Sequence, residues 1–414
     1  MEKKIVEKKA FLWNMIGSIC YSGSSFFYLL LVTRMCGVNE AGVFSLAFAT
    51  AQLLLTIGRF GVRTYQATDL KRHYSFREYG ISRIFTCFLM LAGAFVYVFS
   101  LQFDLWKAEV CIWVTAFKML DAVEDVYHGE LQRLFRVDLM GKALALRNFS
   151  SCALFALFII VTKDILITCI ITTIISLIIC ILANNIFLHK LKYDIGTCEW
   201  LHIKRLMISC FPIFLSTFLS LYLYNVPKYA IDTYMEIEYQ TYYSILFMPS
   251  FVITLFSEIV SKPIMTTITL SWENDIKRFC RLTGILLGMI GIGTILIVLG
   301  GHFIGRRLLE LIYGVDLSSL KTEFIVLLFG GGISASVYIL YNLLIAIRHQ
   351  KCIIFTYGCT AFAMTLEGFW LVKHNGMMGA VLGYLFSCFI LEVIFLTILI
   401  FLIHSRKGIN KHGG

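Results

Sequence analysis

Long apolar runs dominate this sequence and limit what the chain can fold into. Runs of about 18 or more predominantly apolar residues recur from one end to the other, and each has the length of a membrane-spanning helix. Charged residues make up 15% of the 414 residues, against roughly 25% in an average soluble domain. We therefore predict an all-α polytopic membrane protein.

The apolar runs divide into twelve predicted spans with short connections between them. The spans are 11–35, 41–61, 80–101, 106–130, 138–161, 165–188, 203–227, 240–261, 281–300, 322–346, 352–372 and 377–403. No connection is long enough to fold as a soluble domain, so any function belongs to the membrane-embedded helices.

The two halves of the chain share a pattern. The first span ends in Thr33-Arg34 and the seventh ends in Pro227-Lys228, and each is followed by a turn that contains acidic residues. Parallel repeats of this kind place a substrate route at their interface. We expect two pseudo-symmetric six-helix lobes, residues 1–200 and 201–414, around a central cavity.

The distribution of Lys and Arg predicts the orientation in the membrane. Of the 36 basic residues, 27 lie in segments on the side of the N-terminus and 8 on the opposite side. Cytoplasmic loops carry the excess of positive charge in membrane proteins, so both termini are expected in the cytoplasm. The same rule accounts for the net charge of +10, and no nucleic-acid partner is expected.

The span at 106–130 carries the densest set of charges. Lys118 lies about 18 Å from the start of this span at ~1.5 Å per residue, where a charge costs at least ~2.5 kcal/mol. One interpretation is a structural ion pair between Lys118 and a nearby acid. The other is a polar wall of the cavity that takes up a coupling proton or Na⁺, with candidates on or beside one helical face: Asp121, Glu124, Asp125 and His128. Glu258, near the inner end of the eighth span, is a further candidate.

Basic residues in other spans are candidates for binding an anionic substrate. With Lys118 they would form a cationic lining: Arg34, Arg59, Arg147 and Lys228. A guanidinium suits a diphosphate because it donates two parallel charge-assisted hydrogen bonds. Arg34 stands on the outer side, where positive charge is avoided, and is therefore the first of these to test.

Three segments of the sequence resemble a known family. They are VTRMCG…AGVFSLAFATAQLL…FGVR in the first hairpin, EDVYHGELQR…RVDLMGK after the fourth span, and NVPKYAID…YYSILFMPSFVITLFSEIVSKPI around the seventh and eighth spans. In this order they are similar to the bacterial polysaccharide flippases, the Wzx-type members of the multidrug/oligosaccharidyl-lipid/polysaccharide exporter superfamily. The resemblance extends over nearly the whole chain and over its division into two six-helix halves.

The resemblance implies a function in the bacterial cytoplasmic membrane. It implies two lobes around a cationic cavity and transport of an undecaprenyl-diphosphate-linked oligosaccharide to the outer leaflet, for O-antigen, capsule or exopolysaccharide assembly. By position, Arg34, Arg59 and Lys228 would be cavity cations. Expected partners are membrane lipids, glycosyltransferases and a polysaccharide polymerase. No cofactor or metal is expected beyond a coupling H⁺ or Na⁺.

Two other functions remain open from the sequence. A multidrug or cation antiporter of the same fold would need a predominantly acidic cavity, and the candidate cations argue against it. A membrane-embedded glycan polymerase or glycosyltransferase usually carries a sizeable outer loop, and the longest outer connection here, at about 301–321, is short. We therefore expect a transporter and not an enzyme.

Overall fold

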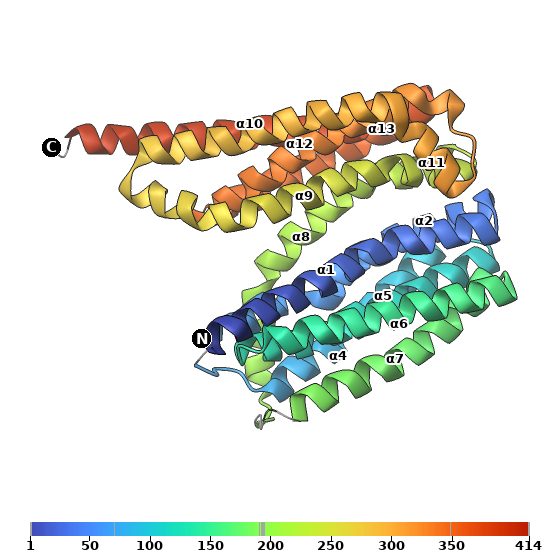
Figure 1. Cartoon of the computed structure of the whole chain (residues 1–414), viewed down its shortest axis with the longest axis horizontal. Helices are drawn as coiled ribbons and strands as arrows, with labels where there is room; N and C mark the ends of the chain where they lie inside the picture. The colour runs from blue at the N-terminus through green and yellow to red at the C-terminus, as the bar shows by residue number, and fades with distance from the viewer. Residues whose placement is uncertain (1, 70, 190, 192–194, 348, 413–414) are drawn as a thin grey trace. The chain divides into compact units, whose positions relative to one another are not determined.

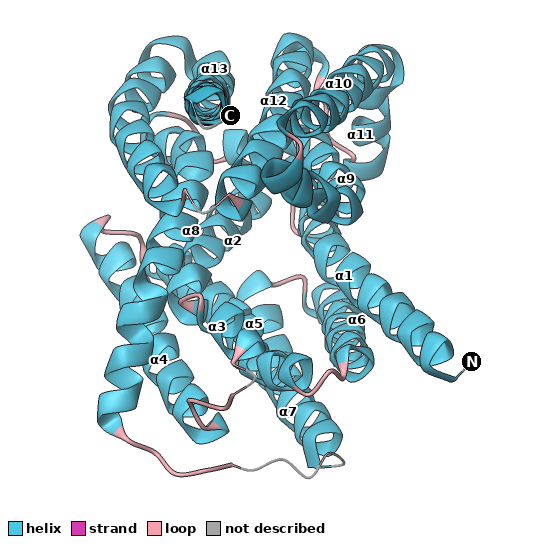
Figure 2. Cartoon of the chain, turned by 90° about the vertical axis from the view of Figure 1, so that its left-hand side faces the viewer, coloured by secondary structure: helices cyan, strands magenta, loops and turns pink. Residues whose placement is uncertain are grey.

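The computed structural model describes residues 2–69, 71–189, 191, 195–347 and 349–412. The regular structure of these residues is entirely helical (Figure 2). The chain divides into two compact units, Met1–Phe218 and Leu219–Gly414. The expected lobe boundary at residue 200 remains a prediction, and each unit is described here by itself.

The first unit is built around one charged helix, α5 (Leu105–Arg133), which packs against helices on several sides. The apolar helix α1 lies along α6, as the blue and green ribbons in Figure 1 show. The other helices of this unit are α1 (Glu2–Met35), α2 (Val38–Arg59), α3 (Val62–Thr68), α4 (Phe76–Ser100), α6 (Val137–Thr162), α7 (Ile165–His189) and the first part of α8 (Trp200–Tyr234).

The second unit is built around α12 (Lys321–Ala346), which packs against α9, α10 and α13. Its core is apolar and includes Leu340, Leu343 and Phe395, all fully buried. The remaining helices are the end of α8, α9 (Glu238–Asn274), α10 (Ile276–Gly300), the short α11 (Arg306–Tyr313) and α13 (Gln350–His412).

The helices confirm the predicted all-α membrane architecture. Within the described residues, nine helices are long and apolar enough to cross a membrane. The helices α5 and α9 have the length of a span as well, with 29 and 37 residues. Helix α13 is broken at Gly376, which has a positive φ of 53°, between the two spans predicted there. The described chain thus provides twelve segments of membrane length.

The distribution of side chains over the first unit is that of a protein in lipid. Large apolar side chains lie on the outside of α4, where Ile84, Phe88 and Phe99 are 68–74% exposed. Charged side chains in the middle of α5, such as Lys118, Asp121 and Glu124, instead lie inside. Because an ionised group is costly in hydrocarbon, it faces the interior of a helix bundle and finds partners there.

Candidate functional site

The acidic face of α5 is enclosed by the other helices of the first unit. Asp121, Glu124, Asp125 and His128 are at most 5% exposed, and Lys118 is 5% exposed. Helices α2, α3, α4, α6 and α7 all pack on α5, so its polar side chains meet partners from several of them. We call the ionised side chains gathered here the α5 cluster: Arg59, Arg63, Arg83, Lys118, Asp121, Glu124, Asp125 and Arg147.

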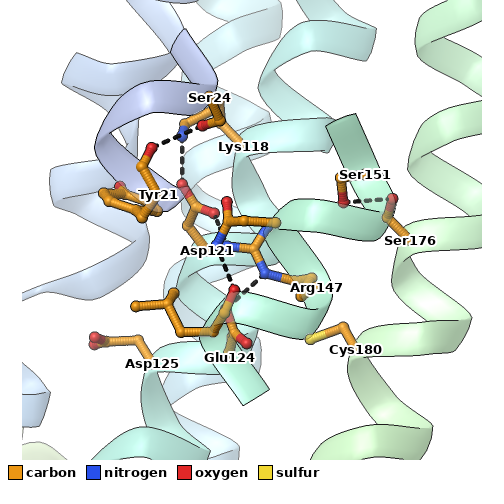
Figure 3. A network of polar contacts seen from close by, with 12 residues as sticks. Tyr21, Ser24, Lys118, Asp121, Glu124, Asp125, Arg147, Ser151, Ser176 and Cys180 are labelled. Carbon is orange, nitrogen blue, oxygen red and sulfur yellow. Dashed lines mark hydrogen bonds and ion pairs between the residues drawn. The ribbon is translucent and has the colours of Figure 1, made fainter. Parts of the chain in front are cut away.

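Arg147 of α6 connects two carboxylates of α5 (Figure 3). Its Nη2 donates to Asp121 Oδ1 at 2.6 Å, and its Nε donates to Glu124 Oε2 at 2.6 Å. The second oxygen of Asp121 pairs with the Lys118 ammonium, one helical turn away. Lys118 Nζ also lies 5.1 Å from the centre of the Tyr21 ring. Lys118 and Arg147 are therefore both neutralised by carboxylates.

Asp125 is held by two arginines that come from α4 and α3. Arg83 Nη2 donates to Asp125 Oδ2 at 2.9 Å, and Arg63 Nη1 lies 3.4 Å from Oδ1. Arg83 also donates to the carbonyl oxygen of Gly58, which accepts a second hydrogen bond from Thr86 at 2.7 Å. Arg83 thus ties the end of α2 to α4 and α5.

His128 lies beside the one carboxylate oxygen of Glu124 that Arg147 does not bind. The distance from His128 Nε2 to Glu124 Oε1 is 3.4 Å. Both atoms are buried, and neither makes a hydrogen bond with the described residues. Glu124 therefore contacts Arg147 through one oxygen and faces His128 through the other.

Arg59, the last residue of α2, differs from the other cations of the cluster. It is half-buried, and its guanidinium donates to the Tyr21 hydroxyl at 3.2 Å. The Nε of Arg59 is buried without a hydrogen-bond partner among the described residues. No carboxylate of the described residues lies within ion-pair distance of its guanidinium. The cluster contains five cations and three carboxylates, and Arg59 is the cation left without a carboxylate.

The remaining predicted residues lie elsewhere. Arg34 is exposed near the end of α1. Lys228 is half-buried on the part of α8 that belongs to the second unit, and its ammonium has no ion-pair partner among the described residues. The backbone carbonyl of Lys228 accepts a hydrogen bond from Gln240. Glu258 falls in α9, but its side chain lies outside the described residues.

Sequence reasoning misses several members of this site. It treats Arg63 and Arg83 only as markers of orientation, and it does not point to Tyr21. The position of Arg83, seven residues after the start of α4 and inside the span predicted at 80–101, is the sequence signal that could have identified it, because a charge within a span requires a partner.

Neither a protein-family model nor a curated protein sequence matches the chain. Solved structures do match. An inward-facing multidrug resistance MATE family transporter of the MOP superfamily is 12% identical with a TM-score of 0.71, covering 96% of this chain and 99% of that one. A MOP superfamily transporter from Pyrococcus furiosus is 13% identical with a TM-score of 0.60, covering 97% and 96%.

A third match is the Vibrio cholerae MATE transporter VcmN in its bent form. It is 14% identical with a TM-score of 0.61, covering 95% of this chain and 97% of that one. The chain has the MOP-superfamily fold. This finding confirms the all-α, two-lobe architecture of about twelve spans. At these identities the MOP fold is shared over the full length, while the residues that bind a substrate need not be.

Proposed function

We propose that this MOP-fold chain is a flippase for a diphosphate-linked lipid oligosaccharide. It would move an undecaprenyl-diphosphate-linked repeat unit from the cytoplasmic to the outer leaflet by alternating access, for assembly of a surface polysaccharide. The observation that carries the proposal is Arg59, a half-buried guanidinium without a carboxylate partner among the described residues, in a cluster that has two more cations than carboxylates.

The energetics of the cargo support a cationic site. A diphosphate and several hydroxyl groups must cross a hydrocarbon layer, and unpaired polar groups are costly there. Fixed guanidinium and ammonium groups offset that cost through charge-assisted hydrogen bonds. Arg59 in the first unit and Lys228 in the second are predicted cations that no carboxylate of the described residues neutralises, so we assign each of them a contact with the anionic cargo. Lys118 and Arg147 hold the helices of the first unit together instead.

The ion pairs of the α5 carboxylates also indicate which of them could exchange a coupling ion. Asp121 and Asp125 each contact two cations, so neither is free to exchange an ion without breaking pairs. Glu124 contacts Arg147 with one oxygen and faces His128 with the other. If transport is coupled to protons, we place the exchanging proton on Glu124 and His128.

The alternative functions fit these contacts less well. A cation antiporter of the same fold would need an acid available to a cationic drug, and the three carboxylates of the α5 cluster are all engaged. The MOP transporter from Pyrococcus furiosus is described as having a binding pocket of reverse polarity and a different function, which supports the view that pocket charge varies on this fold.

The test is export of surface glycan in a bacterial strain that lacks its own flippase. Wild-type chain should restore export, and Arg59→Gln and Lys228→Gln should each reduce it at least tenfold at equal protein level in the membrane. Lys321→Gln, which removes an exposed positive charge at the start of α12, is the matched control and should export normally. Full export by the Arg59→Gln/Lys228→Gln double variant would refute the assignment.

A further inference from the structure

A polar cavity lies at one end of the first unit, away from the α5 cluster's paired acids. It has a volume of about 220 Å³, far above the ~10–15 Å³ that a single water needs on this measure. Its wall comes from the loop between α3 and α4, the start of α4, the end of α5 and the segment that leads into α8. The acidic, basic and histidine side chains that line it are Arg72, His73, Glu78, Arg133, Glu199 and His202.

The buried carboxylate in this cavity is already satisfied by donors. Glu78 accepts from the backbone N–H of Ser75 at 2.8 Å and of Glu199 at 3.1 Å. Its Oε1 also lies 3.1 Å from His202 Nδ1. The other acid, Glu199, has a side chain that is 64% exposed and lies 3.5 Å from His202 Nε2. Both carboxylates therefore already have partners within the protein, and neither requires a bound cation.

Arg133 also lines the cavity, and its guanidinium already has partners within the protein. Its Nη1 donates to the carbonyl oxygen of Tyr74 at 3.1 Å, and its Nη2 donates to Glu130 at 2.8 Å. Burial raises the pKa of the Tyr74 hydroxyl, so that ring stays uncharged beside the cavity. The buried charged groups in the wall of the cavity, Glu78 and Arg133, are thus already paired within the protein.

The cavity side chains that remain available to bind a ligand are hydrogen-bond donors. The side chains of Arg72 and His73 are exposed at the mouth of the cavity, and neither makes a hydrogen bond or ion pair with a described residue. The backbone of Arg72 has a φ of +55°, a conformation that is uncommon for a residue with a side chain. It is held there because the Asp69 carboxylate accepts from the N–H groups of His73 and Tyr74 at 2.9 and 3.0 Å.

Two further contacts hold the loop between α3 and α4 against the segment that leads into α8. The Ser75 hydroxyl donates to the carbonyl of Thr197 at 2.6 Å. Gly196, at φ +70°, packs so closely that an added Cβ would lie 2.5 Å from Ser75 Cβ. Strained residues persist only where the surroundings hold them, and they concentrate at functional sites. Ser75 also caps α4 through a capping box with Glu78, so the helix end is satisfied without a ligand.

We propose that this cavity binds a phosphate-bearing anion, with Arg72 and His73 as its donors and His202 beside them. Phosphate or diphosphate matches the bidentate guanidinium and the size of the cavity. The cavity adjoins Phe76, where the membrane-length helix α4 begins, so the anion could belong to a lipid headgroup as well as to a soluble molecule. The proposal is independent of which cargo the chain transports.

The test measures binding of inorganic diphosphate to the purified full chain by isothermal titration calorimetry in an uncharged detergent. Arg72→Gln should weaken binding about tenfold or more, in line with the loss of one charge-assisted contact. Lys71→Gln is the matched control, because it removes the neighbouring exposed charge that does not line the cavity. Unchanged thermal stability of both variants would show that the fold is kept.

The source of the phosphate is separated by repeating the titration in nanodiscs. If phosphatidylglycerol nanodiscs compete with diphosphate and phosphatidylcholine nanodiscs do not, the cavity holds a lipid headgroup. Equal diphosphate binding in both lipids identifies a soluble ligand. Absence of diphosphate binding to the wild-type chain would overturn the proposal. Equal weakening of binding by Lys71→Gln and Arg72→Gln would also overturn it, because binding would then depend only on the general positive charge of the surface.

Discussion

Arg147 shows why single residues matter so strongly inside this lobe. The residue is 2% exposed, and its guanidinium makes two short hydrogen bonds, to Asp121 and Glu124. Taking three ionised groups out of water is costly, and their mutual attraction offsets that cost only while all of them are present. Removing one partner leaves a buried charge without compensation.

We expect Arg147→Ala to lower the stability of the folded chain by about 3–5 kcal/mol, because Glu124 would lose its strongest partner. The measurement is thermal unfolding in detergent. Arg136→Ala is the control, since Arg136 makes a similar two-pronged contact with Asp138 but is 39% exposed, and such pairs contribute about 0–1 kcal/mol. Equal losses from the two substitutions would contradict the prediction.

The sequence predicts the acids of the α5 cluster better than their partners. Helical spacing alone places Lys118, Asp121 and Asp125 on one face, and a charge at that depth requires a partner. The partners Arg83 and Arg147 lie 42 and 26 residues away in sequence from the acids they bind. Such contacts depend on which helices pack together, and a periodic pattern within one helix carries no information about that.

At the scale of elements, α1 and α6 pack closely because glycine lies at their contact. A Cβ added to Gly141 of α6 would lie 2.5 Å from the carbonyl oxygen of Trp13 and from the N–H nitrogen of Asn14, both on the α1 backbone. Small residues let membrane helices approach in this way, and van der Waals packing then holds them together.

Gly141→Ala should therefore destabilise the first unit by about 1–3 kcal/mol, the usual cost of overpacking. Gly284→Ala on α10 is the matched control, because nothing lies within 4 Å of its added Cβ and alanine is the better helix former. Thermal unfolding of the two variants should move in opposite directions. A stabilised Gly141→Ala variant would show that α1 and α6 are not in this contact.

The spans are predictable as elements, while their ends are less so. Apolar runs mark the part of a helix that crosses hydrocarbon, and the twelve predicted runs all fall on helices in the same order. Helix α8 continues to Tyr234 and α9 to Asn274, beyond the predicted 227 and 261. A helix continues into polar sequence because its backbone hydrogen bonds do not depend on lipid, so an apolar run indicates the minimum length of a helix.

At the scale of the whole molecule, orientation is the prediction that follows from charge counting. We expect the N-terminus, the α3–α4 loop and the C-terminus on the cytoplasmic side. Green fluorescent protein fused after the last residue should then fluoresce, and alkaline phosphatase fused after Asp164, between α6 and α7, should be active. The opposite pattern would invert the topology and would place the cavity at Arg72 on the outer face.

The excess of two cations in the α5 cluster also bears on the thermodynamics of transport. A proton taken up at Glu124 or His128 makes the cluster more positive, so proton binding and anion binding would strengthen each other. Inward proton movement therefore opposes release of an anion on the outer side. A cargo with two negative charges gains roughly 2.3 kcal/mol per charge from an inside-negative potential of 100 mV. If the proposed cargo crosses without an exchanged ion, its export is electrogenic and the membrane potential favours it.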